Sequence, residues 1–232
     1  MSNLYLFDID GTLLNAGDLA VKAYEKALQS VIGIPLSIRD VPCAGRTDPV
    51  IIRELLEKNN QHHHITHEIL NRIFTCFVTN IKEEVDKGYQ VPVIAGVKES
   101  LTYLINKKNV CLGILTGNLQ EGATHKLRAA GLFDYFDTIG AYGSDDEDRN
   151  QLGPIALKRA TDFFQVNFKP EQVFIVGDSE YDIDCARAAG FKVIAVASGK
   201  NSRQELKAKS PDILVNELSP KIFDEKNYDN FS

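Results

Sequence analysis

The stretch LYLFDIDGTLLN, residues 4–15, decides the fold, because an apolar run ends within it on two carboxylates. The segment LYLFDID reads as a buried strand that stops at Asp8 and Asp10. Burying a carboxylate is costly unless a partner offsets its charge. Side chains alternate between the faces of a strand, so the two aspartates are expected to point the same way. The pair is therefore either a solvated strand end or a site that faces a cation.

Other apolar runs of the chain are similar to this one. They show little alternation, as expected of parallel strands that helices cover on both faces. They are VCLGILTG (110–117), VFIVGDS (173–179) and KVIAVAS (192–198), with weaker patterns near 138–141 and 212–215. Helical patterns separate them, at 96–108, 118–131 and 179–190. Alternation of strand and helix predicts an α/β fold with a doubly wound parallel sheet.

One long segment breaks this alternation directly after the first strand. It contains three helical patterns, at 17–33, 48–60 and 66–88, and no convincing strand. We therefore expect residues 16–90 to form a second, smaller helical domain over the strand ends. Residues 1–15 and 91–232 are expected to form the Rossmann-like core domain.

Composition narrows the classes of function. The chain has 232 residues, 44% apolar and 25% charged, with a net charge of −6. It has no basic patch, so nucleic acid is not an expected partner. No apolar run reaches the ~20 residues of a membrane helix, and no signal pattern opens the chain. We expect a cytoplasmic protein that needs no membrane, with a monomer as the default state.

Carboxylates gather at the predicted strand ends, where doubly wound sheets bind their ligands. Asp8, Asp10, Asp178 and Asp182 would converge if the first and fourth strands were neighbours. Four carboxylates cannot all stay ionised in one crevice without a cation. Oxygen ligands without His or Cys favour Mg²⁺. The alternative for GDSEYD (177–182) alone is a helix N-terminus with acidic residues in its first turn.

Anion-binding groups occupy the same edge of the predicted sheet. LTGN (115–118) places Thr116, the Gly117 backbone and Asn118 before a helix N-terminus, which can cradle an anion; the alternative is a capped turn. The best candidate for a cation is Arg149, just before a helix expected from about Gln151. Two alternatives remain: Lys158 could be the cation, and Arg149 could pair with the acidic run 145–148.

Together these features resemble the haloacid dehalogenase-like hydrolase superfamily. DIDGT (8–12) resembles the nucleophile motif, ILTGN (114–118) the second motif and GDSEYD the acidic fourth motif. The helical block at 16–90 resembles the inserted helical cap. The third motif is usually a Lys, and here Arg149 occupies the comparable place. Arginine keeps the charge and adds a bidentate geometry.

The resemblance implies a Mg²⁺-dependent phosphatase, similar to phosphoglycolate phosphatases, that acts on a small phosphorylated metabolite. Asp8 would be the nucleophile that forms an aspartyl-phosphate, and Asp10 the general acid and base. Mg²⁺ would be held by Asp8, the Asp10 backbone carbonyl and Asp178, with Asp182 orienting its waters. Phosphate would be bound by Gly11, Thr116, Gly117, Asn118 and Arg149.

The cap would choose the substrate. In CAGRTDP (43–49), Arg46 could reach a second anionic group of the substrate, or it could be a surface residue of a helix–helix turn. A β-phosphoglucomutase-like enzyme would share all four motifs and stays an alternative. A 2-haloacid dehalogenase has no need of Asp10 or a metal, and a non-catalytic binding relative would be expected to lose these aspartates.

Overall fold

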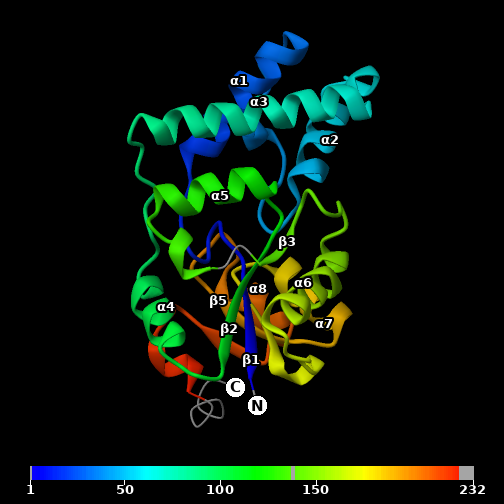
Figure 1. The fold of residues 1–232 in the computed structure, drawn as a ribbon. Coiled ribbons are helices and arrows are strands. Elements are labelled where there is room, and N and C mark those ends of the chain that lie inside the picture. The colour runs from blue at the N-terminus through cyan, green and yellow to red at the C-terminus, as the bar shows by residue number, and fades with distance from the viewer. Residues whose placement is uncertain (1, 137–138, 225–232) are drawn as a thin grey trace.

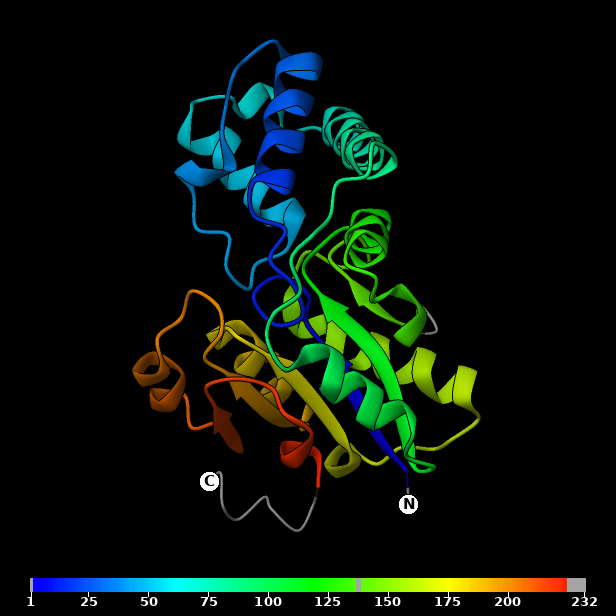
Figure 2. The same ribbon diagram turned by 90° about the vertical axis from the view of Figure 1, so that its left-hand side faces the viewer.

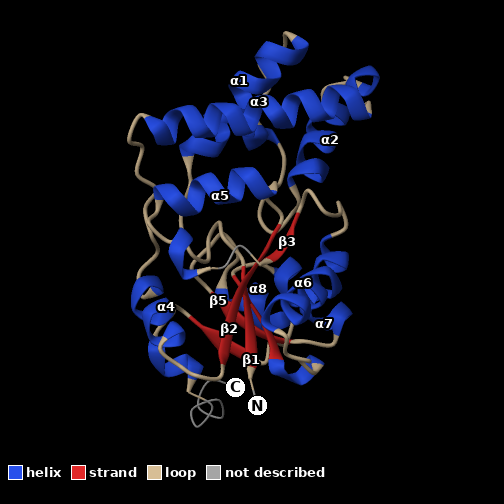
Figure 3. Cartoon of the chain, in the orientation of Figure 1, coloured by secondary structure: helices blue, strands red, loops and turns tan. Residues whose placement is uncertain are grey.

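A six-stranded parallel sheet forms the centre of the computed structural model, which describes residues 2–136 and 139–224. Its strand order is β3-β2-β1-β4-β5-β6, and Figures 1 and 3 show the sheet with helices around it. The strands are β1 (Asn3–Phe7), β2 (Val110–Thr116), β3 (Gly140–Tyr142), β4 (Val173–Gly177), β5 (Lys192–Val196) and β6 (Ile213–Val215). The predicted doubly wound parallel sheet is confirmed. Part of the strand expected near 138–141 falls on Thr138, outside the described residues.

Helices connect the strands and cover both faces of the sheet. They are α1 (Asp18–Ile32), α2 (Asp48–Lys58), α3 (His67–Asp86), α4 (Val97–Ile105), α5 (Gln120–Ala129), α6 (Arg149–Phe164), α7 (Glu180–Ala189) and α8 (Arg203–Ala208). The expected start of the helix near Gln151 was wrong by two residues. Asp148 caps α6 by accepting a hydrogen bond from the Asn150 amide, so Arg149 is the first helical residue.

Alternate side chains of β1 enter two separate apolar clusters. Leu4 and Leu6 belong to the cluster that includes residues of α6 and α7. Tyr5 and Phe7 belong to the other, which includes residues of α4 and of the helices α1 to α3. This alternation follows from the period of two in a strand. It places β1 in the middle of the molecule, covered on both faces.

The helices α1, α2 and α3 lie together beyond the carboxyl ends of the strands (Figure 2). Tyr24 of α1 stacks on Phe77 of α3 with ring centroids 3.6 Å apart. Helix α3 also packs on α5, where a side chain at Gly122 would meet the Phe77 ring at 3.1 Å. Within the described ranges, no helix is both long enough and apolar enough to cross a membrane.

The strand order brings the polar strand ends together. After β1 the chain builds one side of the sheet with β2 and β3 and then returns to build the other side from β4 onward, so β1 lies between β2 and β4. Residues that follow these three strands therefore meet at one edge, which is where open α/β sheets bind ligands. Asp8, Thr116 and Asp178 all stand at that edge.

Candidate active site

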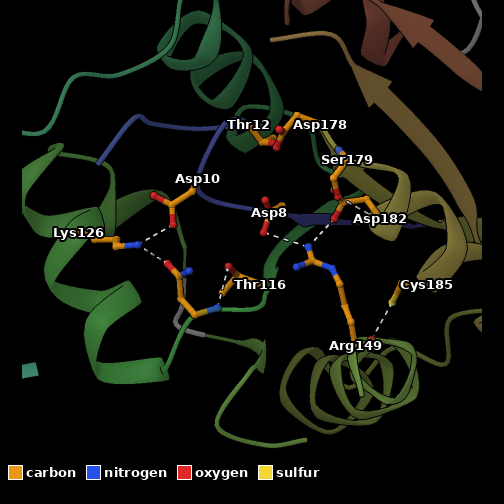
Figure 4. A network of polar contacts seen from close by, with 11 residues as sticks. Asp8, Asp10, Thr12, Thr116, Lys126, Arg149, Asp178, Ser179, Asp182 and Cys185 are labelled. Carbon is orange, nitrogen blue, oxygen red and sulfur yellow. Dashed lines mark hydrogen bonds and ion pairs between the residues drawn. The ribbon is translucent and has the colours of Figure 1, made fainter. Parts of the chain in front are cut away.

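Three buried carboxylates meet at the ends of β1 and β4. Asp8, Asp178 and Asp182 each offer one oxygen, and these oxygens lie within 4.8 Å of one another (Figure 4). Asp8 directly follows β1, Asp178 directly follows β4, and Asp182 lies in the first turn of α7. All three are at most 5% exposed. This cluster includes three of the four carboxylates expected to converge.

Small and hydroxylic residues shape the space around Asp178. The Thr12 hydroxyl donates a hydrogen bond of 2.9 Å to Asp178 Oδ1. Gly11 has φ +89°, and a Cβ there would lie 2.4 Å from Asp178 Oδ2. Glycine at position 11 therefore meets both a backbone requirement and a steric one. The chain turns sharply after β1 so that Asp178 can approach it.

Asp182 is held by its own helix terminus. Ser179 and Asp182 form a capping box, in which the Ser179 amide and hydroxyl donate to Asp182 Oδ2 at 3.0 and 2.6 Å. The other oxygen accepts a hydrogen bond from Arg149. Both oxygens of Asp182 are thus already engaged by the protein.

Arg149 enters the cluster from the first turn of α6. One terminal nitrogen donates to Asp8 Oδ1 at 3.1 Å and to Asp182 Oδ1 at 2.5 Å. Burial lowers the pKa of Arg149, but the Asp182 and Asp8 carboxylates outweigh burial and raise it above its ordinary value. Lys158, the alternative cation, is exposed further along α6. The structure therefore brings Arg149, and not Lys158, to the carboxylates.

Burial makes the remaining charge in this cluster costly. It raises the pKa of Asp8 to about 7, with Arg149 opposing and Asp182 adding to the shift. It raises the pKa of Asp178 to about 8, with further contributions from the Asp8 and Asp182 charges. One guanidinium does not neutralise three carboxylates, so the cluster favours a further cation. A set of carboxylate oxygens fits a hard ion such as Mg²⁺.

Asp10 does not join this acidic cluster, contrary to the expected convergence of four carboxylates. Its Oδ2 accepts a hydrogen bond of 2.6 Å from Lys126 of α5, and its side chain is 37% exposed. β1 ends at Phe7, so the strict alternation of a strand does not extend to residue 10. Asp8 and Asp10 therefore face two different cations, Arg149 and Lys126 (Figure 4).

The predicted anion cradle lies between these two cations. Thr116 is buried at the end of β2, and its hydroxyl accepts a hydrogen bond of 3.3 Å from the Asn118 amide. The Asn118 side-chain oxygen accepts a hydrogen bond of 2.8 Å from Lys126. At Gly117 a Cβ would lie 2.1 Å from the Arg46 carbonyl oxygen. The absence of a side chain there allows another segment of the chain to approach closely.

That segment is residues 43–49, here called the docking loop. It lies within the inserted helical segment, ends in the first residues of α2, and contacts the strand ends. The Asp48 amide donates to Gly117 O at 2.7 Å, and the Thr47 hydroxyl donates to Glu147 O at 2.8 Å. The Arg46 guanidinium forms an ion pair with Glu54 and donates to Pro42 O. Its side chain is therefore engaged within the inserted segment, while its backbone lies against the core.

Asp48 is a buried carboxylate at the point of contact. Its Oδ2 accepts a hydrogen bond of 2.8 Å from the Leu119 amide, at the start of α5. The Tyr24 hydroxyl faces the same carboxylate, although it makes no well-formed hydrogen bond to any described residue. Burial raises the pKa of Asp48 to about 6, and the nearby Lys126 opposes this rise.

The raised pKa of Asp48 predicts a pH-dependent loss of stability. The Asp48 carboxyl group keeps its proton to a higher pH in the folded protein than in the unfolded chain. The stabilising contribution is therefore complete below about pH 4 and lost as the pH rises through about 6, a change of about 3 kcal/mol. Asp48→Asn should remove this component. Urea unfolding across this pH range should show that the free energy of unfolding depends less on pH in Asp48→Asn than in the exposed control Asp40→Asn. Parallel pH profiles for the two variants would contradict the assignment.

Lys126 and Asp48 are the site residues that sequence reasoning missed. Lys126 follows Leu119 by seven residues and Ala123 by three, and it precedes Ala130 by four, so it falls on the same helical face as these apolar residues. A charged residue on an apolar face is a signal that it has a buried partner. Asp48 carried no comparable signal, because its position at the start of a helix is ordinary for an aspartate.

The parallel sheet, the helices on both of its faces and the carboxylates at its edge define an α/β enzyme. The chain belongs to the haloacid dehalogenase-like hydrolase family, whose profile matches residues 5–196. It is thus a hydrolase, as the resemblance of its motifs predicted.

Similar proteins extend over nearly the whole chain. A pyrophosphatase PpaX from Bacillus thuringiensis (strain Al Hakam) is 25% identical over 226 residues, 94% of this chain and 93% of that protein. The crystal structure of CbbY from Rhodobacter sphaeroides, in complex with phosphate, has a TM-score of 0.71 at 18% identity and covers 99% of this chain and 100% of that one. A predicted phosphoglycolate phosphatase from Haemophilus somnus has a TM-score of 0.67 at 21% identity, covering 93% and 94%. At these identities the two structures establish the fold.

Proposed function

We propose that this hydrolase is a Mg²⁺-dependent phosphatase that acts on a small phosphomonoester through an aspartyl-phosphate on Asp8. The observation that carries the proposal is the buried Asp8–Asp178–Asp182 cluster with Arg149 inserted into it. A carboxylate nucleophile, a cation beside it and further carboxylates for a metal are the groups that phosphoryl transfer to an aspartate requires. The names of the relatives support the same class of reaction.

Each side chain has a role that follows from its position. Asp8 attacks phosphorus through the oxygen that Arg149 does not bind. Arg149, Thr116 and the amides after β2 bind the phosphoryl oxygens. Asp10, on the other side of the turn, gives a proton to the leaving alcohol and takes one from the water that hydrolyses the acyl phosphate. Gly11 permits the turn that keeps Asp8 and Asp10 apart.

Asp8, the Asp10 carbonyl and Asp178 would hold Mg²⁺, which supplies positive charge between the nucleophile and the phosphate. Asp182 has both oxygens bound by Ser179 and Arg149, so it would orient groups around the metal and not bind it directly. Asp178 keeps Oδ2 available, since Thr12 bonds to Oδ1.

We further propose that residues 16–90 act as a cap over a core formed by 1–15 and 91–232. Two chain segments join the parts and pair with each other, through Asn15 N to Pro92 O at 2.9 Å and Ile94 N to Leu13 O at 3.1 Å. Gly17 and Gly96 have positive φ beside these segments. Opening there would release the docking loop and admit the substrate. A cytoplasmic, monomeric state stays a prediction.

The test is hydrolysis of p-nitrophenyl phosphate, phosphoglycolate, hexose phosphates and inorganic pyrophosphate, with Mg²⁺ and with EDTA. We expect phosphate release that requires Mg²⁺, with a preference among the esters set by the docking loop. Pyrophosphate belongs in the panel because of the PpaX relatives. Release that EDTA does not affect would contradict the metal assignment. Isomerisation of a hexose phosphate without release of phosphate would favour the β-phosphoglucomutase alternative.

A further inference from the structure

Lys126 is a buried lysine to which none of the roles above has been given. It lies in α5, only 3% of the residue is exposed, and α5 packs between the strand ends and α3 (Figure 1). Lysine is almost never fully buried unless it is paired. Its ammonium group must therefore obtain its partners from the site beneath it.

Those partners are two polar side chains from different strand ends. Lys126 Nζ donates to Asp10 Oδ2 at 2.6 Å and to Asn118 Oδ1 at 2.8 Å. Asp10 follows β1 and Asn118 follows β2, so the ammonium joins the two turns that flank the reacting centre. A third charged group, Asp48 of the docking loop, lies near enough to Lys126 to be affected by its charge.

This arrangement restrains Asp10 in particular. The Asp10 side chain is more than one-third exposed, so surrounding atoms do not fix its orientation by packing. A general acid has to stay within hydrogen-bond reach of the leaving oxygen. One charge-assisted hydrogen bond to an immobile ammonium limits the rotation of the carboxylate and leaves Oδ1 available for proton transfer.

We propose that Lys126 is a positioning residue for the proton transfer by Asp10, an inference that rests on the proposed phosphatase function. Its ammonium holds Asp10 and Asn118 in one fixed arrangement. It does not itself contact the phosphoryl group. Removing it should therefore slow the steps that need a positioned proton more than the steps that do not.

Leaving groups of different basicity separate these steps. A primary alkoxide needs a proton as it leaves, whereas p-nitrophenolate leaves as a stable anion. The parameter kcat/KM reports the reaction up to departure of the leaving group. Hydrolysis of the acyl phosphate comes later and is the same step for both substrates, so it does not affect the comparison. Lys126→Met should lower kcat/KM for both substrates. We expect the loss for a primary alkyl phosphate to be about 10-fold or more larger than the loss for p-nitrophenyl phosphate.

The experiment compares wild type, Lys126→Met and Lys126→Arg on both substrates, with Arg128→Met as the matched control. Arg128 is an exposed cation of the same helix that lies over the Phe133 ring, away from the site. The control should keep the wild-type ratio of the two kcat/KM values. Lys126→Arg should have a ratio between those of wild type and Lys126→Met. If Lys126→Met does not fold, Lys126→Gln takes its place.

Equal losses on the two substrates, or no loss, in a folded Lys126 variant would overturn the proposal, because a purely structural role does not depend on the leaving group. A wild-type enzyme that hydrolysed neither ester would instead contradict the proposed phosphatase function. The two failures are therefore distinguishable.

Discussion

Asp8→Asn is expected to lower phosphomonoester turnover by about 10⁴-fold or more while leaving the fold intact. The amide is nearly the same shape as the carboxyl, but it cannot act as the nucleophile that forms an acyl phosphate. Asp8 lies among like charges, and burial raises its pKa to about 7. Removing its charge relieves repulsion with Asp178 and Asp182, so the variant should be no less stable than wild type.

The measurement pairs steady-state turnover with urea unfolding for Asp8→Asn and for Asp162→Asn, an exposed aspartate of α6. The control should match wild type in both. If Asp8→Asn kept more than about one-tenth of the activity, Asp8 would not be the nucleophile. A variant that lost both activity and fold would show that Asp8 has a structural role.

Arg149→Met should be severe in both stability and activity. The guanidinium is buried and bonds to Asp8 and Asp182. Removing one partner of a buried ion pair leaves uncompensated charge, which typically costs about 3–5 kcal/mol. Activity should fall as well, because the phosphoryl oxygens lose a cation. Arg149→Lys should recover part of the stability and part of the activity, since an ammonium keeps the charge but not the planar, forked geometry of the guanidinium.

Urea unfolding at neutral pH and steady-state kinetics test this expectation against Arg72→Met, an exposed arginine of α3. The control should lose less than about 0.5 kcal/mol. Wild-type stability in Arg149→Met would mean that the neighbouring carboxylates do not depend on this charge.

Local patterns in the sequence predicted most of the fold. Continuous apolar runs identified β1, β2, β4 and β5, and helical periodicity identified the three helices between 18 and 86. Both signals come from residues close together in the chain. The strand ends then followed from the parallel arrangement, which is why Asp8 and Asp178 could be placed together in advance.

Contacts between distant segments could not be predicted in the same way. Asp10 and Lys126 are separated by 116 positions, and Asp48 and Leu119 by 71. Nothing in a local pattern specifies how the inserted helices lie over the strand ends. The pairing of Asp10 with Lys126, and not with the acidic cluster, depends on how α5 lies over the turn that follows β1. The close approach at Gly117 likewise depends on where the docking loop lies.

Turnover is expected to pass through a covalent phosphoryl group on Asp8. The most direct test is a rapid acid quench of the enzyme with p-nitrophenyl phosphate and Mg²⁺, followed by mass spectrometry of the peptide that contains residues 4–15. We predict an added mass of one phosphoryl group on Asp8, absent from Asp8→Asn and from enzyme without substrate. Turnover with no phosphorylated Asp8 under quench conditions that preserve a synthetic acyl phosphate, or the same added mass on another residue, would contradict the account.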